Sequence, residues 1–269
     1  MLPLNERHMS AMALRTYLSC PLRFRYRYLD NLYWSRQWGS APEEQKALER
    51  GQNFHLMARR YYAGVDPAQV ADPVEQSELE AWIQLLAGFL PRTADRAFHP
   101  ELELRLNRPD LRLMAKFVLV VVDSDGRATI FDWKTEKRMP RKSYLLKSPQ
   151  TLVYRYMLCA AGGQYSPRGR FKPDEIEMIY WNPLYPSRWE RLPYSEAQFQ
   201  KDAEYLRSLT AQILRTPREA FLATSEMNIC RHCEYQMICH GRRAEQIDTE
   251  EEEALYEATL SWEDLPELP

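Results

Sequence analysis

The stretch Thr129–Ile130–Phe131–Asp132–Trp133–Lys134–Thr135 decides the fold of this chain. β-Branched and aromatic side chains lead into a carboxylate and an ammonium, which is typical of a buried strand and its end. Because side chains alternate along a strand, we expect Asp132 and Lys134 on one face and Trp133 on the other. The charged pair is either a surface ion pair or a place where a divalent cation meets a phosphate or a water.

The segments on both sides of this stretch indicate an α/β protein. Alternating and continuous apolar runs predict strands over 100–106, 111–122, 128–134, 175–181 and 189–192. Apolar periodicity and capping residues, such as Ser10 before the first helix, predict helices over 10–18, 22–34, 42–62, 74–90, 148–161 and 195–215. We therefore expect a mixed central sheet with helices packed against it.

The charges divide the chain into a basic body and an acidic end. From Ala244 onwards the sequence has ten acidic residues and no Lys or Arg, so residues 1–243 hold 36 basic and 28 acidic side chains. A basic body fits a polyanionic partner, whereas an acidic end without functional consequence is the alternative interpretation. We find no apolar leader and no apolar run of membrane-spanning length, so we expect a cytoplasmic protein with no membrane partner.

Clustered cysteines predict a metal site near the C-terminus. They follow a C-x2-C-x5-C spacing and are Cys230, Cys233 and Cys239. Disulfides are disfavoured in a cytoplasmic chain, and Cys20 can join the three as a fourth thiolate, tying the two ends of the chain together. Four thiolates suit an iron–sulfur cluster or zinc, and in a zinc site His232 or His240 can replace one sulfur. Cys159 lies among apolar residues and is expected in the core.

The hairpin around Asp132 offers a second set of metal ligands. Strand pairing can bring Glu101 beside Asp132, and Glu103, on the same strand face as Glu101, is the alternative ligand. Mg²⁺ or Mn²⁺ takes carboxylate oxygens, waters and a backbone carbonyl, for which Trp133 is in position. Lys134 would orient an attacking water and stabilise charge on a phosphodiester. The hairpin therefore predicts metal-dependent hydrolysis of phosphodiesters.

Six motifs in order make the chain resemble a known family. They are Tyr17–Leu18–Ser19–Cys20–Pro21, Gly51-xxx-His55, Pro100–Glu101, Asp132-x-Lys134, Gln150-xxx-Tyr154 and the C-x2-C-x5-C end. Together they resemble the PD-(D/E)xK nucleases, specifically the RecB-like branch with a cysteine-bound 4Fe-4S cluster. That branch includes the AddB nuclease domain and the CRISPR-adaptation exonucleases. The resemblance covers nearly the whole chain up to about Gly241.

The resemblance implies a role for each matching residue. The metal ligands or their close supports would be His55, Glu101, Asp132 and the Trp133 carbonyl. The catalytic lysine would be Lys134. The residues that support the active site and the DNA strand would be Gln150 and Tyr154. The 4Fe-4S cluster, or zinc in its place, would be held by Cys20, Cys230, Cys233 and Cys239.

The resemblance also implies an architecture and a function. We expect a helical part over 1–95 with Cys20 and His55, a restriction-endonuclease-like core over 96–215, a cysteine segment over 216–243 and an acidic tail over 244–269. The implied activity is a Mg²⁺- or Mn²⁺-dependent DNase acting on ends or single strands in DNA repair, recombination or defence. The implied partners are DNA and a helicase or another subunit of a nuclease complex.

One position departs from the pattern of this branch. There the strand before Asp132 carries G-x-I-D, and the alignment of the hairpin places Val118 where a metal-binding Asp is expected, while Asp123 and Asp125 lie in the turn. Two unit charges about 4 Å apart interact by about 4 kcal/mol at an effective dielectric of about 20, and a divalent ion doubles that. After desolvation, a net loss of ~3 kcal/mol would weaken metal binding roughly a hundredfold.

Three functional hypotheses follow from the sequence. The first is a metal-dependent DNase that is impaired by Val118. The second is a catalytically silent DNA-binding or scaffold subunit with the same fold. The third is a zinc-stapled α/β protein unrelated to nucleic acid.

Overall fold

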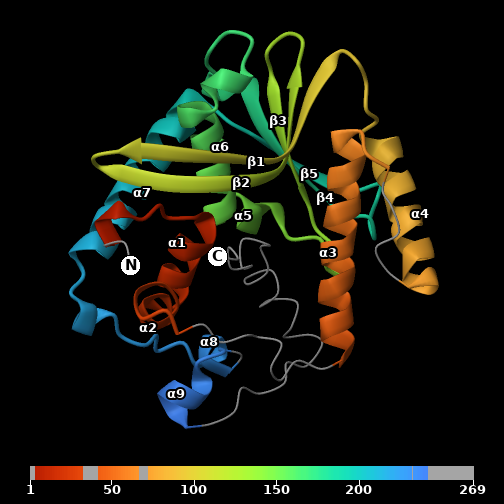
Figure 1. Cartoon of the computed structure of the whole chain (residues 1–269). Coiled ribbons are helices and arrows are strands. Elements are labelled where there is room, and N and C mark those ends of the chain that lie inside the picture. The colour runs from red at the N-terminus through yellow and green to blue at the C-terminus, as the bar shows by residue number, and fades with distance from the viewer. Residues whose placement is uncertain (1–3, 33–41, 67–71, 232, 242–269) are drawn as a thin grey trace.

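The computed structural model describes residues 4–32, 42–66, 72–231 and 233–241, and its centre is one mixed sheet (Figure 1). The strands lie in sequence order and are β1 (Arg96–Arg108), β2 (Leu111–Asp123), β3 (Ala128–Trp133), β4 (Ile176–Trp181) and β5 (Trp189–Pro193). Only the β3–β4 pair among them is parallel, because α6 crosses between these two strands, and the other pairs are antiparallel. The predicted mixed sheet of an α/β fold is confirmed.

Helices cover both faces of this sheet (Figure 1). One face packs on α3 (Pro42–Ala63) and α4 (Pro73–Phe89) through a core that includes Phe54, Trp82 and Trp133. The other face packs on α1 (Ala11–Ser19), α6 (Pro149–Ala161) and α7 (Glu196–Arg215), through a larger core. Phe131 and Trp133 enter the α3 layer while Ile130 enters the opposite one, which is the alternation expected of a strand and agrees with the predicted orientation of Trp133.

Local capping fixes where the main helices begin. The Ser10 hydroxyl accepts a hydrogen bond from the Ala13 N–H at 3.1 Å, which confirms the predicted N-cap of α1. Asp72 caps α4 in the same way, accepting from Val74 at 3.0 Å and from Glu75 at 3.1 Å. These bonds satisfy backbone donors that have no partner inside the helix.

Several element bounds differ from the prediction. Strand β1 begins at Arg96, earlier than expected, because Arg96–His99 lack alternation but pair with the long partner strand β2. The predicted helix over 22–34 is a short α2 (Pro21–Phe24) followed by a π-helical turn, η2 (Arg25–Leu29), and residues 33 and 34 lie outside the described residues.

Short helices occupy segments for which no helix was predicted. The α-helical ones are α5 (Lys142–Leu145), α8 (Met227–Arg231) and α9 (Gln236–His240). The 3₁₀ turns are η1 (Leu4–Glu6), η3 (Gly163–Tyr165), η4 (Pro173–Glu175) and η5 (Arg218–Ala220). One- and two-turn helices such as these have too few residues to show apolar periodicity.

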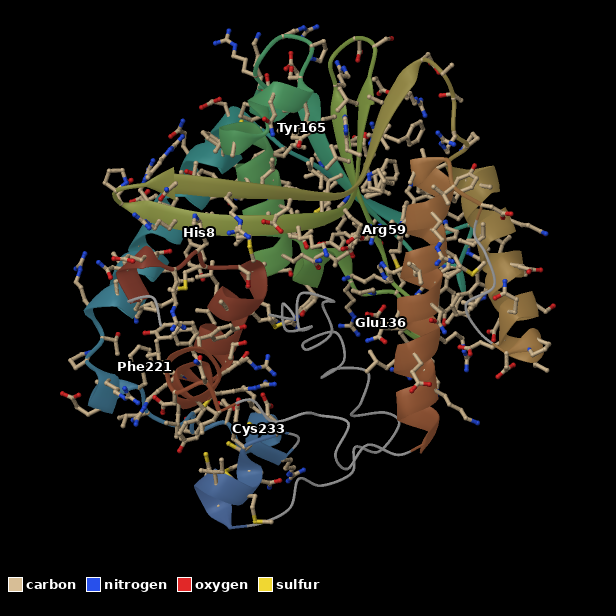
Figure 2. All side chains as sticks on the ribbon, viewed as in Figure 1. His8, Arg59, Glu136, Tyr165, Phe221 and Cys233 are labelled. Atoms are coloured by element: carbon tan, nitrogen blue, oxygen red, sulfur yellow. The ribbon has the colours of Figure 1, made fainter. Side chains whose placement is uncertain are left out.

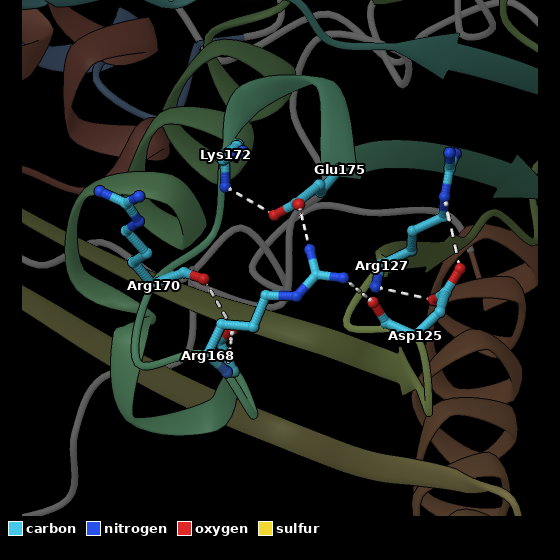
Figure 3. A network of polar contacts seen from close by, with 7 residues as sticks. Asp125, Arg127, Arg168, Arg170, Lys172 and Glu175 are labelled. Atoms are coloured by element: carbon cyan, nitrogen blue, oxygen red, sulfur yellow. Dashed lines mark hydrogen bonds and ion pairs between the residues drawn. The ribbon is translucent and has the colours of Figure 1, made fainter.

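A polar network fixes the loop after α6 against the β2–β3 turn (Figure 3). The Arg168 guanidinium donates to the Asp125 carbonyl at 2.6 Å and pairs with the Glu175 carboxylate. Glu175 also accepts from the Lys172 N–H at 3.0 Å. Gly126 has φ +84° in this turn, a backbone conformation that disfavours a side chain.

In the described part of the chain, the helices are too short or too polar for any of them to cross a bilayer. The acidic tail over 244–269 and His232 lie outside the described residues.

Candidate active site

Asp132, Lys134 and Gln150 form a closed polar triangle at the end of β3. The Lys134 ammonium lies 2.8 Å from Asp132 Oδ2 and donates to Gln150 Oε1 at 3.2 Å. The Gln150 amide, on the first turn of α6, donates to Asp132 Oδ1 at 2.9 Å. The Asp132 side chain is only 3% exposed, so its charge is compensated by these neighbours rather than by solvent. The predicted common orientation of Asp132 and Lys134 is confirmed.

Tyr180 lies beneath the Lys134 ammonium of this triangle and was not predicted as a site residue. It lies on β4 in register with Asp132, and its ring centroid is 5.4 Å from Lys134 Nζ. The Tyr180 hydroxyl shares a 2.8 Å hydrogen bond with the Thr151 hydroxyl of α6. A cation over an aromatic face is stabilised by the ring quadrupole, so Tyr180 helps to hold the ammonium in place.

His55 approaches the same strand end from α3. Its imidazole hydrogen-bonds to the Trp133 backbone, and burial lowers its pKa to about 4, although the Asp132 carboxylate opposes that shift. The helix comes close here because residue 51 is glycine: a Cβ on Gly51 would lie 2.8 Å from Thr135 Oγ1. The Gly51-xxx-His55 motif thus lets α3 approach and presents a neutral imidazole near Asp132.

Glu101 is buried beside the triangle but pairs with another residue. Its carboxylate, 9% exposed, lies 3.1 Å from Lys116 Nζ, and burial raises its pKa. The Tyr154 hydroxyl donates to the Lys116 carbonyl at 2.7 Å, so α6 supports this strand as well. Glu103 instead pairs with Arg105 at 2.6 Å and is largely exposed. Of the two candidate glutamates, Glu101 is the buried one.

Val118 occupies the strand position between Glu101 and Asp132. The β1–β2 ladder pairs Leu102 with Phe117 but omits the Glu101–Val118 pair, because Glu101 has a left-handed φ of 54°. Val118 is 7% exposed and packs in the core on the α3 side of the sheet. The middle strand therefore brings an apolar side chain to the position where the resembled family has a carboxylate.

The polar atoms at this end of the sheet suit a cation. Asp132 Oδ2 and Glu101 Oε2 face the Lys134 and Lys116 ammonium groups at 2.8 Å and 3.1 Å, whereas Glu136 Oε2 is buried with no hydrogen-bond partner in the described structure. A buried acceptor without a donor is a place for an ion or a water, and hard oxygen ligands are those that Mg²⁺ and Mn²⁺ prefer. As the side chains of the described residues stand, no three His, Cys, Asp or Glu are closed around one ion position.

The cysteine segment folds against the N-terminal helices, as the two-ended motif predicted. In Figure 1, α8 and α9 lie beside α2, and Figure 2 marks Cys233 there. Cys20, Cys230 and Cys233 are buried, and Cys239 is exposed. Burial raises the pKa of Cys233 to about 12, and the Cys20 thiol adds to the raised pKa of each of the other three. The Cys20 thiol thus lies within electrostatic range of the other three, although no three of the described thiols are arranged around one ion position.

Other contacts hold this segment in place without any metal. The Arg23 and Arg27 guanidinium groups each lie 2.8 Å from the Glu234 carboxylate, whose side chain is 1% exposed. Phe24 stacks on Phe221 with ring centroids 5.8 Å apart. Cys159 lies apart from this segment, and its thiol donates to the Phe171 carbonyl at 3.3 Å. His240, the alternative zinc ligand, is exposed.

Among the comparisons with known proteins, a family model matches most of the chain. No curated protein matches the chain. A solved structure titled "Crystal structure of SSO0001" has a TM-score of 0.39 and 16% identity over 88% of each chain, a likeness too weak to carry an argument. The model of the PD-(D/E)XK nuclease superfamily matches residues 8–240, which include the Asp132–Lys134 strand end and all five cysteines. The chain belongs to the PD-(D/E)XK nuclease superfamily.

Proposed function

We propose that this protein is a metal-dependent deoxyribonuclease that acts on DNA ends or single strands. The observation that carries the proposal is the triangle of Asp132, Lys134 and Gln150, in which a buried carboxylate and an ammonium are held at 2.8 Å by a third side chain. A surface ion pair needs no such support, whereas phosphodiester hydrolysis needs a fixed acid and cation at one place.

The residues at the end of β3 have two different roles, metal binding and stabilisation of negative charge. His55, Asp132 and the Trp133 carbonyl would hold Mg²⁺ or Mn²⁺, with Glu101 as a close support. When bound, this ion supplies Lewis acidity to a phosphoryl oxygen. Burial opposes the charge on Lys134, but the Asp132 and Glu136 carboxylates outweigh burial and raise its pKa, so it remains an ammonium. As an ammonium, Lys134 can orient a water and stabilise negative charge on the phosphate.

A basic loop beside the strand end supports DNA as the partner. Directly after β3, the sequence carries exposed or part-exposed cationic side chains on a loop and a short helix: Lys137, Arg138, Arg141 and Lys142. Cationic side chains near an active site attract the phosphate backbone irrespective of sequence. The surplus of basic residues over 1–243 acts in the same direction.

Cleavage of end-labelled single-stranded DNA in Mn²⁺ tests the proposal. We expect wild-type protein to cleave, and Lys134→Ala to lose activity about a hundredfold or more because a group that stabilises the transition state is removed. Lys172→Ala removes an exposed lysine that directly precedes η4, and this variant should cleave like wild type. Equal cleavage by wild type and Lys134→Ala would contradict the enzyme assignment.

The cysteine segment is the basis for a second cofactor. We infer that Cys20, Cys230, Cys233 and Cys239 bind a 4Fe-4S cluster, with zinc as the alternative, because the C-x2-C-x5-C segment packs beside Cys20 and three of the four thiols are buried there. Iron, sulfide and zinc analysis of protein purified without oxygen distinguishes the two. Cys20→Ser should lose the metal, and Cys159→Ser, which changes a thiol outside the segment, should keep it.

One observation favours a second candidate function. Because Val118 brings no carboxylate between Glu101 and Asp132, the site has one acid fewer than the resembled family. A protein of this fold that binds DNA without cleaving it, alone or as a subunit beside a helicase or nuclease, is consistent with that loss. DNA binding with no cleavage in either Mn²⁺ or Mg²⁺ would support this alternative.

A further inference from the structure

Glu136 is a buried carboxylate with no role in the family pattern. It follows Lys134 by two residues, and its Oε2 is buried with no hydrogen-bond partner in the described part of the chain. Burial raises its pKa, the Lys134 ammonium lowers it and the Asp132 carboxylate raises it. Both members of the catalytic pair are therefore within electrostatic range of Glu136.

The backbone around Glu136 is held from two sides. The Lys134 N–H donates to the Trp181 carbonyl at 2.8 Å, and the Asn182 side-chain amide donates to the Glu136 carbonyl at 2.8 Å. From the other side, α3 meets Thr135 at Gly51. Figure 2 shows Glu136 next to α3, consistent with that contact. These contacts keep the Glu136 side chain at the Asp132 end of the sheet.

A divalent cation beside Asp132 needs a second carboxylate. A single carboxylate compensates only half of a divalent charge, and hydrated Mg²⁺ or Mn²⁺ is usually held by more than one oxygen ligand. Val118 supplies none, and Glu101 is engaged with Lys116. Glu136 Oε2, by contrast, has no hydrogen-bond partner among the described residues.

We propose that Glu136 supplies to a divalent cation beside Asp132 the carboxylate that Val118 does not provide. This inference rests on the proposed metal-dependent function and extends it to a residue outside the family motif. The side chains are not closed around an ion as they stand, so cation binding draws the Glu136 carboxylate towards Asp132. The Glu136 carboxylate, two residues after Lys134, thereby takes the place of the carboxylate that position 118 lacks.

Mn²⁺ binding in the absence of DNA tests this inference directly. Free Mn²⁺ is measured by electron paramagnetic resonance during titration of the full chain. Glu136→Gln preserves shape but removes the charge, and we expect it to weaken Mn²⁺ binding about ten- to a hundredfold. Glu78→Gln, which removes one exposed carboxylate from α4, should bind like wild type.

A rescue experiment separates ligation from structural damage. In the double variant Val118→Asp with Glu136→Gln, a carboxylate returns on the other side of Asp132, and Mn²⁺ affinity should recover to near the wild-type value. Glu136→Asp, which keeps the charge, covers the case in which Glu136→Gln fails to fold, and it should retain most of the binding. Thermal unfolding in EDTA checks that each variant folds.

The outcomes distinguish this inference from the proposed function. If Asp132→Asn loses Mn²⁺ binding and cleavage while Glu136→Gln keeps both, the metal-dependent function stands and the role of Glu136 is refuted. Failure of the double variant to recover affinity refutes it as well. If wild-type protein neither binds Mn²⁺ nor cleaves DNA, both proposals fall together.

Discussion

Val118 is the residue that most limits the expected activity. It lies between Glu101 and Asp132 on the middle strand of the hairpin and is 7% exposed. Restoring the acid with Val118→Asp should raise Mn²⁺-dependent cleavage about tenfold or more, because a second carboxylate strengthens cation binding. Cleavage is measured on end-labelled single-stranded DNA over a range of Mn²⁺ concentrations.

An uncharged variant of similar shape provides the control for this change. Val118→Asn adds polarity without charge and should not raise cleavage. Without metal, the Val118→Asp variant should unfold at a lower temperature than wild type, because an acid buried near another acid is unfavourable. If its cleavage rate equals that of wild type at every Mn²⁺ concentration, position 118 does not face the cation.

His55 makes the stability of the protein depend on pH. Burial lowers its folded-state pKa to about 4, below the ordinary value of 6.5, so the unfolded chain binds a proton more readily than the folded protein between these values. The stabilisation is complete above pH 6.5 and is lost as the pH falls towards 4. From pH 7 to pH 5.5 we expect this histidine to reduce the free energy of unfolding by about 1 kcal/mol.

Urea denaturation in EDTA at the two pH values measures this effect. The comparison is with His55→Gln, which cannot titrate and should show a smaller loss over the same interval. The difference between wild type and variant is the quantity of interest, since other groups titrate in both. An equal loss in the two proteins would mean that His55 is not buried in its neutral form.

At the residue scale, simple periodicities account for the part of the site that was predicted. Strand alternation put Asp132 and Lys134 together, and the i, i+4 spacing put Gln150 and Tyr154 on one face of α6, where both contact the hairpin. Tyr180 and Glu136 were not predicted. Their placement depends on β4 lying in parallel register with β3, which no local pattern specifies.

At the scale of secondary-structure elements, the contact between the cysteine segment and the N-terminal helices depends on Glu234. Its carboxylate is buried and joins Arg23 and Arg27, so one side chain links α2 and η2 to the segment between α8 and α9. Glu234→Gln leaves two guanidinium groups without a counter-charge, which costs about 3 kcal/mol for a buried pair. Local opening of the segment should therefore become about a hundredfold more frequent.

Amide hydrogen exchange locates this effect. Exchange in α8 and α9 should accelerate in Glu234→Gln, while exchange in α7 stays as in wild type. Glu78→Gln, which breaks an exposed pair with Arg50, should change neither region. Uniform acceleration throughout the protein would show that Glu234 supports the whole fold rather than this one contact.

The elements themselves were predictable where their patterns were long. The hairpin, the two long helices of the α3 side and α7 all follow from apolar periodicity and caps. The early start of β1 was missed because Arg96–His99 become a strand only through pairing with β2. The helix predicted over 22–34 divides into α2 and the π-helical turn η2, and the alternating Arg and Tyr side chains of η2 do not distinguish a π-helical from an α-helical turn.

For the molecule as a whole, the N-terminal helices meet the cysteine segment at one place, while Asp132 and Lys134, the proposed catalytic pair, lie at another. Residues near 20 pack against residues 221–239, away from the strand end that carries Asp132 (Figure 1). The backbone N–H of Leu22 donates to the Leu222 carbonyl at 3.0 Å at this junction. Under the proposed function, the four cysteines of this junction join the N-terminal helices to the cysteine segment, and the chemistry takes place at the sheet.

Limited proteolysis tests this division. If the four cysteines bind a cluster or zinc, Cys20→Ser removes the only ligand from the N-terminal helices, and trypsin should cut faster at Arg215, Arg218 and Arg231. The sheet and the helices on its two faces should survive as a resistant fragment, because most of their buried residues lie outside this junction, which contributes Phe24 and Phe221 to the larger core. Wild-type protein stripped of metal by a chelator should give the same fragments. Cys159→Ser, whose thiol lies elsewhere, should be cut like untreated wild type, and an unchanged pattern in Cys20→Ser would mean that Arg23, Arg27 and Glu234 close the chain without any metal.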